Sequence, residues 1–173
     1  MKKNEYELLK QRYATFGKGR SHRLKGFDYS IPGYPFYITT CTRENERFLN
    51  NADLSGCFVS TVEDAIRKYN LKAYILGVMP THYHFLFELT ETSGVSLFQV
   101  MKSINGKSRL YGYKMLGEKI WQRGYYEHII RREENVIEIA KYISANPKRW
   151  KEQGKPRPGD RFVVKWFVNM KEE

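Results

Sequence analysis

The chain has 173 residues, 41% of them hydrophobic, which suits one folded domain with a sizeable core. Thirty Lys and Arg against nineteen Asp and Glu give a formal net charge of +11, which favours a polyanionic partner such as nucleic acid or a membrane surface. Cys41 and Cys57 are too few for a disulfide framework or a cysteine-rich zinc site. With no apolar run long enough for a signal peptide or a membrane span, we expect a soluble cytoplasmic protein that does not associate with membranes.

Residues 1–33 are expected to form a basic lead-in to the main domain. Apolar side chains recur about once per turn over residues 4–16, which predicts a short helix. The rest of the lead-in is rich in glycine and predicts irregular chain. Arg20, Arg23 and Lys25 in this part are either solvated surface residues or an arm that contacts phosphates.

Residues 34–150 are expected to form the main domain, because apolar periodicity there alternates between two and 3.6 residues. The predicted elements are a strand over 35–42, a helix over 53–70, a strand over 71–79, a strand over 82–88, a helix over 96–115 and a strand over 119–132. This order predicts an α+β fold of the ferredoxin-like βαββαβ type, with an antiparallel sheet and both helices on one face. The other face of the sheet is left for a ligand or a later element.

The strand over 82–88 carries two of the four histidines of the chain. Side chains two apart on a strand share a face, so His82 and His84 point the same way at metal-ligand spacing. Tyr83 and Phe85 point to the opposite face and are interpreted as core. The alternative is that two histidines fell by chance on a half-exposed strand, because a short motif alone has a high false-positive rate.

A last helix is predicted from Glu133 to Asn146, ending there because Pro147 disfavours helix in the residue before it. Its apolar stripe would pack on the open sheet face, while Tyr142 and Asn146, one turn apart, share a face beside that stripe. Taken alone, Tyr142 is better interpreted as an ordinary boundary residue, and Asn146 as a simple helix stop. Residues 151–173 are expected to form a basic C-terminal tail.

Three blocks, in this order, resemble the single-tyrosine HUH transposases, and most closely the REP-associated tyrosine transposases. The blocks are Pro80-x-His82-Tyr83-His84, Trp121-Gln122 followed by Tyr126-Glu127-His128-x-Ile130-Arg131, and Tyr142-Ile143-x-x-Asn146-Pro147. The lead-in from Arg23 to Gly33 and the strand from Phe36 to Thr42 are also similar to that branch, so the resemblance covers about residues 20–150. Relaxases differ because their tyrosine precedes the histidine pair. Asn146 stands where many insertion-sequence relatives have Gln, and it is the residue found in the REP-associated branch.

The resemblance implies a metal-dependent endonuclease and strand transferase that cleaves and rejoins single-stranded DNA at hairpin sites. Tyr142 would be the nucleophile that forms a 5′-phosphotyrosine, because a phenolate can both attack and later leave. His82, His84 and Asn146 would bind Mg²⁺ or Mn²⁺, although the ligand types alone also suit Zn²⁺. The expected partner is a REP-like or insertion-sequence-end hairpin, and a homodimer is compatible with the resemblance.

Further residues are assigned supporting roles by the same resemblance and by charge. The candidates for DNA contacts are Arg20, Arg23, Lys25, Arg123 and Arg131. Either Glu127 or His128, which alternate sides on the last predicted strand, would orient a ligand or the nucleophile.

Two other classes of protein remain open on sequence grounds. A non-catalytic nucleic-acid-binding module of the RNA-recognition type uses the same scaffold, but it exposes aromatic rings on its central strands and carries a glycine-rich motif that this chain lacks. A metal-dependent hydrolase that transfers phosphate to water would not need Tyr142. A covalent protein–DNA adduct would distinguish the transposase-like class from both.

Overall fold

The computed structural model describes residues 24, 26–131, 134–154 and 156–168. Its strands are β1 (Pro35–Cys41), β2 (Lys72–Met79), β3 (His82–Glu88), β4 (Tyr126–Ile129) and β5 (Val163–Trp166). Its helices are α2 (Ala52–Lys68), α3 (Leu97–Leu116), α4 (Val136–Ser144) and α5 (Asn146–Glu152), with short 3₁₀ turns η1 (Arg43–Asn45) and η2 (Phe48–Asn50) after β1. The helix predicted over 4–16, and Arg20, Arg23 and Lys25, lie outside the described residues.

The strands form one antiparallel sheet in the order β4-β1-β3-β2-β5. Its first four strands have the order of a ferredoxin-like βαββαβ unit, so the α+β prediction is confirmed. The fifth strand, β5, was not expected from the sequence. It pairs with β2, from Val163 opposite Val78 to Trp166 opposite Ile75, and so extends the sheet at its β2 edge.

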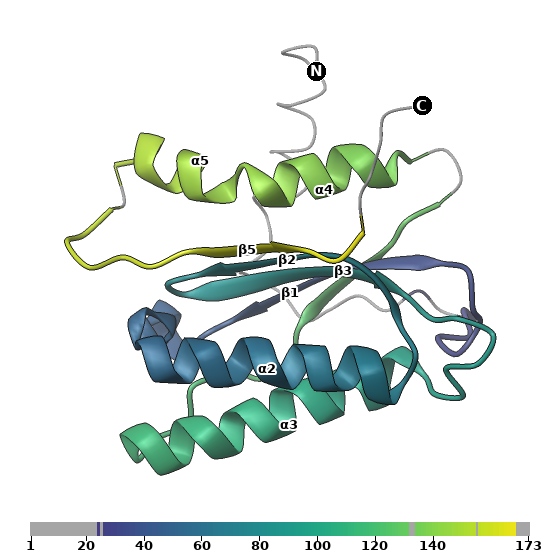
Figure 1. Cartoon of the computed structure of the whole chain (residues 1–173), viewed down its shortest axis with the longest axis horizontal. Helices are drawn as coiled ribbons and strands as arrows, with labels where there is room; N and C mark the ends of the chain where they lie inside the picture. The colour runs from purple at the N-terminus through teal and green to yellow at the C-terminus, as the bar shows by residue number, and fades with distance from the viewer. Residues whose placement is uncertain (1–23, 25, 132–133, 155, 169–173) are drawn as a thin grey trace.

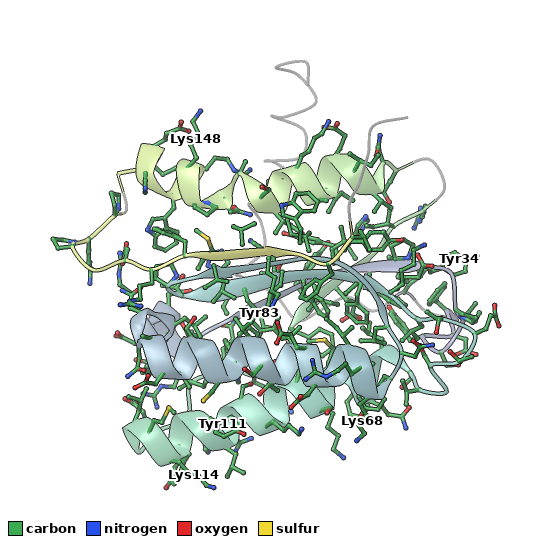
Figure 2. The ribbon with its side chains drawn as sticks, viewed as in Figure 1. Tyr34, Lys68, Tyr83, Tyr111, Lys114 and Lys148 are labelled. Atoms are coloured by element: carbon green, nitrogen blue, oxygen red, sulfur yellow. The ribbon has the colours of Figure 1, made fainter. Side chains whose placement is uncertain are left out.

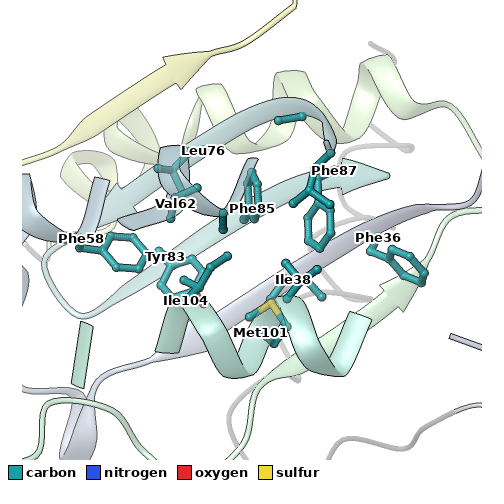
Figure 3. Packing of buried hydrophobic residues seen from close by; sticks show 14 of the residues in the cluster. Phe36, Ile38, Phe58, Val62, Leu76, Tyr83, Phe85, Phe87, Met101 and Ile104 are labelled. Carbon is teal, nitrogen blue, oxygen red and sulfur yellow. The ribbon is translucent and has the colours of Figure 1, made fainter. Parts of the chain in front are cut away.

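Helices α2 and α3 cover one face of the sheet, and the main hydrophobic core lies between them and β1, β2 and β3 (Figure 1). Asn51 caps α2 by accepting from the backbone N–H of Leu54, and a Ser96–Gln99 capping box starts α3. Tyr83 is fully buried among the aromatic and aliphatic side chains of this core (Figure 3), as predicted. It is drawn between the sheet and α2 in Figure 2.

Helices α4 and α5 cover the opposite face, the one that carries the histidines (Figure 1). A smaller core of Tyr37, Ile75 and Leu86 from the sheet and Ile139 and Ile143 from α4 joins the two layers. The predicted role of the last helix as a cover for the open face is therefore confirmed.

Close packing at Gly77 fixes the height of α4 above the sheet. A β-carbon placed on Gly77 would lie 2.7 Å from Cγ2 of Ile143, a distance that real contacts do not reach. Gly77 is opposite His84 in the β2–β3 pairing, so α4 approaches the sheet directly beside this histidine. The missing side chain at residue 77 thus brings the helix that carries Tyr142 down onto the histidine strand.

Two predicted boundaries are corrected by the structure. The strand predicted over 119–132 is ordered as β4 only from Tyr126, because Gly124 has a φ of 86° and turns the chain; Trp121 still makes an isolated bridge to Thr42. The last helix ends at Ser144 rather than at Asn146, and α5 then begins at Asn146. Pro147 is tolerated in the first turn of α5, where its missing N–H would have no helical partner.

Candidate active site

His82 and His84 lie in the middle of the sheet on the face covered by α4 and α5. Their ring centroids are 4.9 Å apart, so the structure brings together the pair expected from the sequence. His84 is 6% exposed and His82 is half-buried. Thr39 of β1 is directly opposite His84, and Cys41 is opposite His82. The two imidazoles thus share one site on β3, which lies between β1 and β2 in the sheet.

Hydroxyl groups hold both imidazoles through their Nδ1 atoms. Nδ1 of His84 is 2.9 Å from the hydroxyl of Tyr37 and 2.9 Å from that of Thr39. Nδ1 of His82 is 3.0 Å from the hydroxyl of Thr81. Hydrogen bonds to one ring nitrogen orient a histidine and reserve the other for a metal. In both residues Nε2 is therefore the nitrogen suited to be a ligand.

Burial is the main reason why the pKa of His84 lies well below its ordinary value, and the nearby charges of His82 and Arg149 lower it further. The imidazole is neutral at pH 7 as a result. Neutral imidazole is the form that can donate a lone pair to a metal ion.

Tyr142 of α4 lies over the histidine strand. Its ring centroid is 6.3 Å from that of His84 and 6.4 Å from that of Tyr37. The guanidinium carbon of Arg149 is 3.7 Å from the centroid of the Tyr142 ring, and Nη2 of Arg149 donates to the Tyr142 carbonyl at 2.5 Å. Arg149 is buried, so a desolvated positive charge lies against the phenol ring. The ring is held near both the histidines and this cation.

Asn146 is the first residue of α5, directly after the break between the two helices that cover the site. Its amide Nδ2 donates to the Tyr142 carbonyl at 3.3 Å, so the side-chain oxygen is the end left for another partner. Four residues before it, Tyr142 contacts His84, and four residues after it, the Trp150 ring lies 6.0 Å from that of His82. Asn146 thus lies in the sequence midway between two residues whose rings contact the histidine pair.

The donor types limit what this site can hold. Among the described residues, no group of three or more His, Cys, Asp or Glu side chains is placed to bind a metal ion. A third protein ligand to a metal bound by His82 and His84 would therefore be of another type, such as an amide oxygen. Such a mixed nitrogen and oxygen set, with few protein ligands, leaves coordination positions for substrate oxygens.

The other predicted site residues fall on different sides of the sheet. His128 is opposite Tyr37 and thus on the α4 side, with Nε2 2.9 Å from Oε1 of Glu134, just before the N-cap of α4. Glu127 is opposite Ile38, whose side chain belongs to the core under α2 and α3. Arg123 and Arg131 are both exposed, in the chain on either side of β4.

The sequence analysis missed several residues that contact the site, among them Tyr37, Thr39 and Arg149. Tyr37 and Thr39 alternate on a strand and so share a face, but their place opposite His84 depends on the pairing of β1 with β3. Arg149 lies at helical spacing from Tyr142 and Asn146, at i, i+4 and i+7, a signal hidden by the expectation that the helix would end at Asn146.

The chain is an α+β domain that places a tyrosine-bearing helix over a histidine pair on an antiparallel sheet. It belongs to the IS200-like transposase family, whose model matches residues 33–146. This membership assigns the chain a transposase-like function in DNA processing. Within the described ranges, no helix has the length and hydrophobicity required to cross a membrane.

Several individual proteins are also similar to this chain, in sequence or in fold. A protein of Haemophilus influenzae described as uncharacterized is 27% identical, with 77% of this chain and 90% of that protein covered. The structure of a REP-associated tyrosine transposase bound to a REP hairpin has a TM-score of 0.56 and 18% identity, over 79% of this chain and 81% of the other, which shows a shared fold. A transposase structure from Deinococcus radiodurans has a TM-score of 0.49 and 15% identity, over 78% of this chain and 99% of the other.

Proposed function

We propose that the protein is a metal-dependent single-strand DNA endonuclease and strand transferase in which Tyr142 is the nucleophile. The observation that carries this proposal is the contact of the Tyr142 ring with His84, at 6.3 Å between centroids, on the face that holds both histidines. Arg149 lies against the same ring and donates to the Tyr142 carbonyl, so it helps to hold the tyrosine over the histidine strand. Membership of a transposase family also supports a role for this tyrosine in DNA cleavage.

The proposed reaction exchanges one phosphodiester for another. The phenol oxygen of Tyr142 loses its proton to solvent and attacks the scissile phosphorus. The bond from phosphorus to the 3′ oxygen breaks, the 3′ oxygen takes up a proton, and the 5′ phosphate stays on the tyrosine. A 3′-OH that later attacks this phosphotyrosine rejoins DNA, and the phenolate leaves. Because the energy of the broken bond is kept in the phosphotyrosine, no external energy source is needed.

His82, His84 and the side-chain oxygen of Asn146 would hold Mg²⁺ or Mn²⁺. The residues fit this role, because hydroxyls bond Nδ1 of both rings and the amide nitrogen of Asn146 is bonded to a carbonyl. When bound, the ion would supply positive charge to the phosphate oxygens. Tyr37 and Thr39 keep the His84 ring in one orientation, and His128 with Glu134 ties the start of α4 to β4.

We further propose that the substrate is a single-stranded DNA hairpin, such as a REP-like element or an insertion-sequence end. The net charge of +11 supports a polyanionic substrate, and the protein with a similar fold was solved with a REP hairpin. An RNA-recognition-type platform is less suitable, because it needs exposed rings on the central strands, whereas α4 and α5 cover those strands here. The nearest branch would be the REP-associated one, as Asn146 suggests.

The test is adduct formation on a labelled single-stranded hairpin oligonucleotide, with and without Mn²⁺. Wild type should give a covalent protein–DNA band that depends on Mn²⁺ and a free 3′-OH fragment. Tyr142→Phe should give neither, while its binding of the same DNA stays within about twofold, since one hydroxyl is lost. Tyr111→Phe is the matched control, because Tyr111 is exposed on α3, across the sheet from the site.

Other outcomes assign other functions. Undiminished cutting by Tyr142→Phe would show transfer to water, as in a hydrolase. Tight DNA binding by wild type without any cleavage or adduct would show a non-catalytic binding module. His82→Ala and His84→Ala should each abolish the adduct and weaken Mn²⁺ binding in calorimetry. Unchanged Mn²⁺ affinity in either variant would make that histidine structural.

A further inference from the structure

A cluster of hydrogen bonds centred on Asp160 lies beside the His82 end of the candidate active site. Asp160 lies shortly before β5, and its side chain is 3% exposed. It accepts from groups in three parts of the chain, namely the Arg47 guanidinium, the Asn50 amide, the Trp150 indole N–H and the backbone N–H of Arg157. The proposed reaction uses none of these contacts.

The carboxylate of Asp160 is kept charged by these donors. Burial by itself would raise its pKa, but the hydrogen bonds from Arg47, Asn50, Arg157 and Trp150 outweigh burial and hold the pKa well below its usual range. A charged acceptor makes stronger and more directional hydrogen bonds than a neutral one. The 3.0 Å bond to Nε1 of Trp150 is therefore a firm constraint on the indole.

Trp150 connects this cluster to the active site. Its ring centroid lies 6.0 Å from that of His82, and the guanidinium carbon of Arg47 lies 5.4 Å from the indole centroid. The indole is 9% exposed, so it cannot rotate without displacing its neighbours. A change in the indole direction set by Asp160 would thus move the His82 ring.

We propose that Asp160 is a positioning residue for His82 and acts through the indole of Trp150. The segment before β5, which the sequence presented as part of a tail, thereby helps to set the geometry of the histidine pair. The effect on catalysis rests on the proposed function, whereas the coupling of Asp160 to the His82 ring is a property of the free protein. Asp160 would not take part in the chemistry itself, because its hydrogen bonds are to Arg47, Asn50, Arg157 and Trp150 and not to the histidines or Tyr142.

The test compares Asp160→Asn with Asp64→Asn in the full chain. Asp64 is a suitable control, because it is an ion-paired aspartate on α2, 52% exposed and across the sheet from the site. In metal-free protein, NMR should show that Asp160→Asn moves the indole N–H signal of Trp150 and the ring signals of His82. Calorimetry should then show Mn²⁺ binding weakened about tenfold. This is the lower end of the 10- to 100-fold loss of metal affinity that is typical when a group that orients a metal ligand is removed. Asp64→Asn should change neither.

Kinetics provide a readout that a merely structural role would not affect. With folding verified by circular dichroism, Asp160→Asn should lower kcat for hairpin cleavage and leave KM for DNA unchanged. Asp160→Glu, which keeps the charge, should recover part of the loss. A His82 signal that stays in place while the Trp150 signal moves would overturn the proposal.

Two further results remain decisive. If Asp160→Asn does not fold, Trp150→Phe keeps an aromatic ring and removes the N–H donor; it should also shift the His82 signals, and unchanged signals would overturn the proposal. If wild type neither cleaves DNA nor binds Mn²⁺, the proposed function fails. The His82 signals of the metal-free variants still decide whether Asp160 positions that ring.

Discussion

His84 is held by several neighbouring groups in the candidate active site. It is buried, its Nδ1 is bonded to two hydroxyls, and the Tyr37 ring stacks on it at 5.5 Å between centroids. A ligand whose orientation is already fixed loses little freedom when it binds a metal. Metal affinity at this site should therefore depend on Tyr37 and Thr39 as well as on the histidines.

Thr39→Val is expected to weaken Mn²⁺ binding about tenfold, since loss of a group that orients a metal-bound histidine typically costs 10- to 100-fold. Thr61→Val is the control, because it removes a similarly buried hydroxyl, bonded to the Cys57 carbonyl in α2. Both variants should lose about 1 kcal/mol of unfolding free energy. Calorimetry with Mn²⁺ and urea unfolding separate the two effects. Equal Mn²⁺ affinity in the two variants would show that the Thr39 hydroxyl serves stability alone.

For single residues, the sequence predicts which side chains share one face of a strand or helix, because local periodicity determines this. His82 and His84 share a face because any strand repeats every two residues, and Tyr142 and Asn146 share one because a helix repeats every 3.6. The hydroxyl of Thr39 could not be assigned to His84, because the two residues are 45 positions apart and meet only through strand register. Arg149 was missed because its contact with Tyr142 requires the chain to remain helical beyond Pro147.

At the scale of elements, the position of α4 determines whether Tyr142 reaches the histidine strand. The N-cap Asn135 starts the helix, and Glu134 just before it bonds His128 of β4. Near its end, Ile143 fits over Gly77, beside His84. The helix is thus fixed to the sheet at both ends.

Gly77→Ala is expected to push α4 away from β2, because the new methyl group would overlap Cγ2 of Ile143. Overpacking of this kind costs about 1–3 kcal/mol of unfolding free energy. Because Ile143 is adjacent to Tyr142, adduct formation should fall by more than tenfold, that is by more than about 1.4 kcal/mol in activation free energy.

Gly56→Ala is the matched control for this variant. A methyl group at Gly56 of α2 meets nothing within 4 Å, so it should stabilise the helix by about 0.5–1 kcal/mol. Its adduct formation should remain at the wild-type level. If Gly77→Ala forms the adduct as fast as Gly56→Ala, close seating of α4 is not required for the reaction.

The elements that were predicted have strong periodicity of their own, as β3 and α2 do. In contrast, β5 is four residues long and half-exposed, and it is ordered by pairing with the edge of β2. The start of α5 at Asn146 was also missed, since Pro147 disfavours the interior of a helix but suits its first turn. Both elements depend on contacts with the folded sheet. Local residue patterns do not predict such contacts between distant parts of the chain.

On the scale of the whole molecule, the excess of positive charge should determine how binding responds to salt. Each phosphate neutralised on single-stranded DNA lowers log K by about 0.7 per decade of salt, so five neutralised phosphates give a slope of about −3.5. Two groups of cations are candidates for this role: the lead-in residues Arg20, Arg23 and Lys25, and the exposed pair Arg123 and Arg131 beside β4.

Replacement of the three lead-in cations by Gln should flatten the salt slope for a hairpin with a single-stranded flank by up to about two units. Replacement of Arg123 and Arg131 by Gln should flatten it by up to about 1.4 units, at about 0.7 for each phosphate that is no longer neutralised.

Lys114→Gln is the control, because Lys114 lies on α3, across the sheet from α4 and α5 (Figure 2), and the slope should stay at the wild-type value. The measurement is a fluorescence titration at several salt concentrations, with a blunt duplex as competitor. Equal affinity for the duplex would exclude selective binding of the unpaired strand, and a slope that changes as much in Lys114→Gln as in the other variants would mean that DNA binds to the α3 side of the molecule.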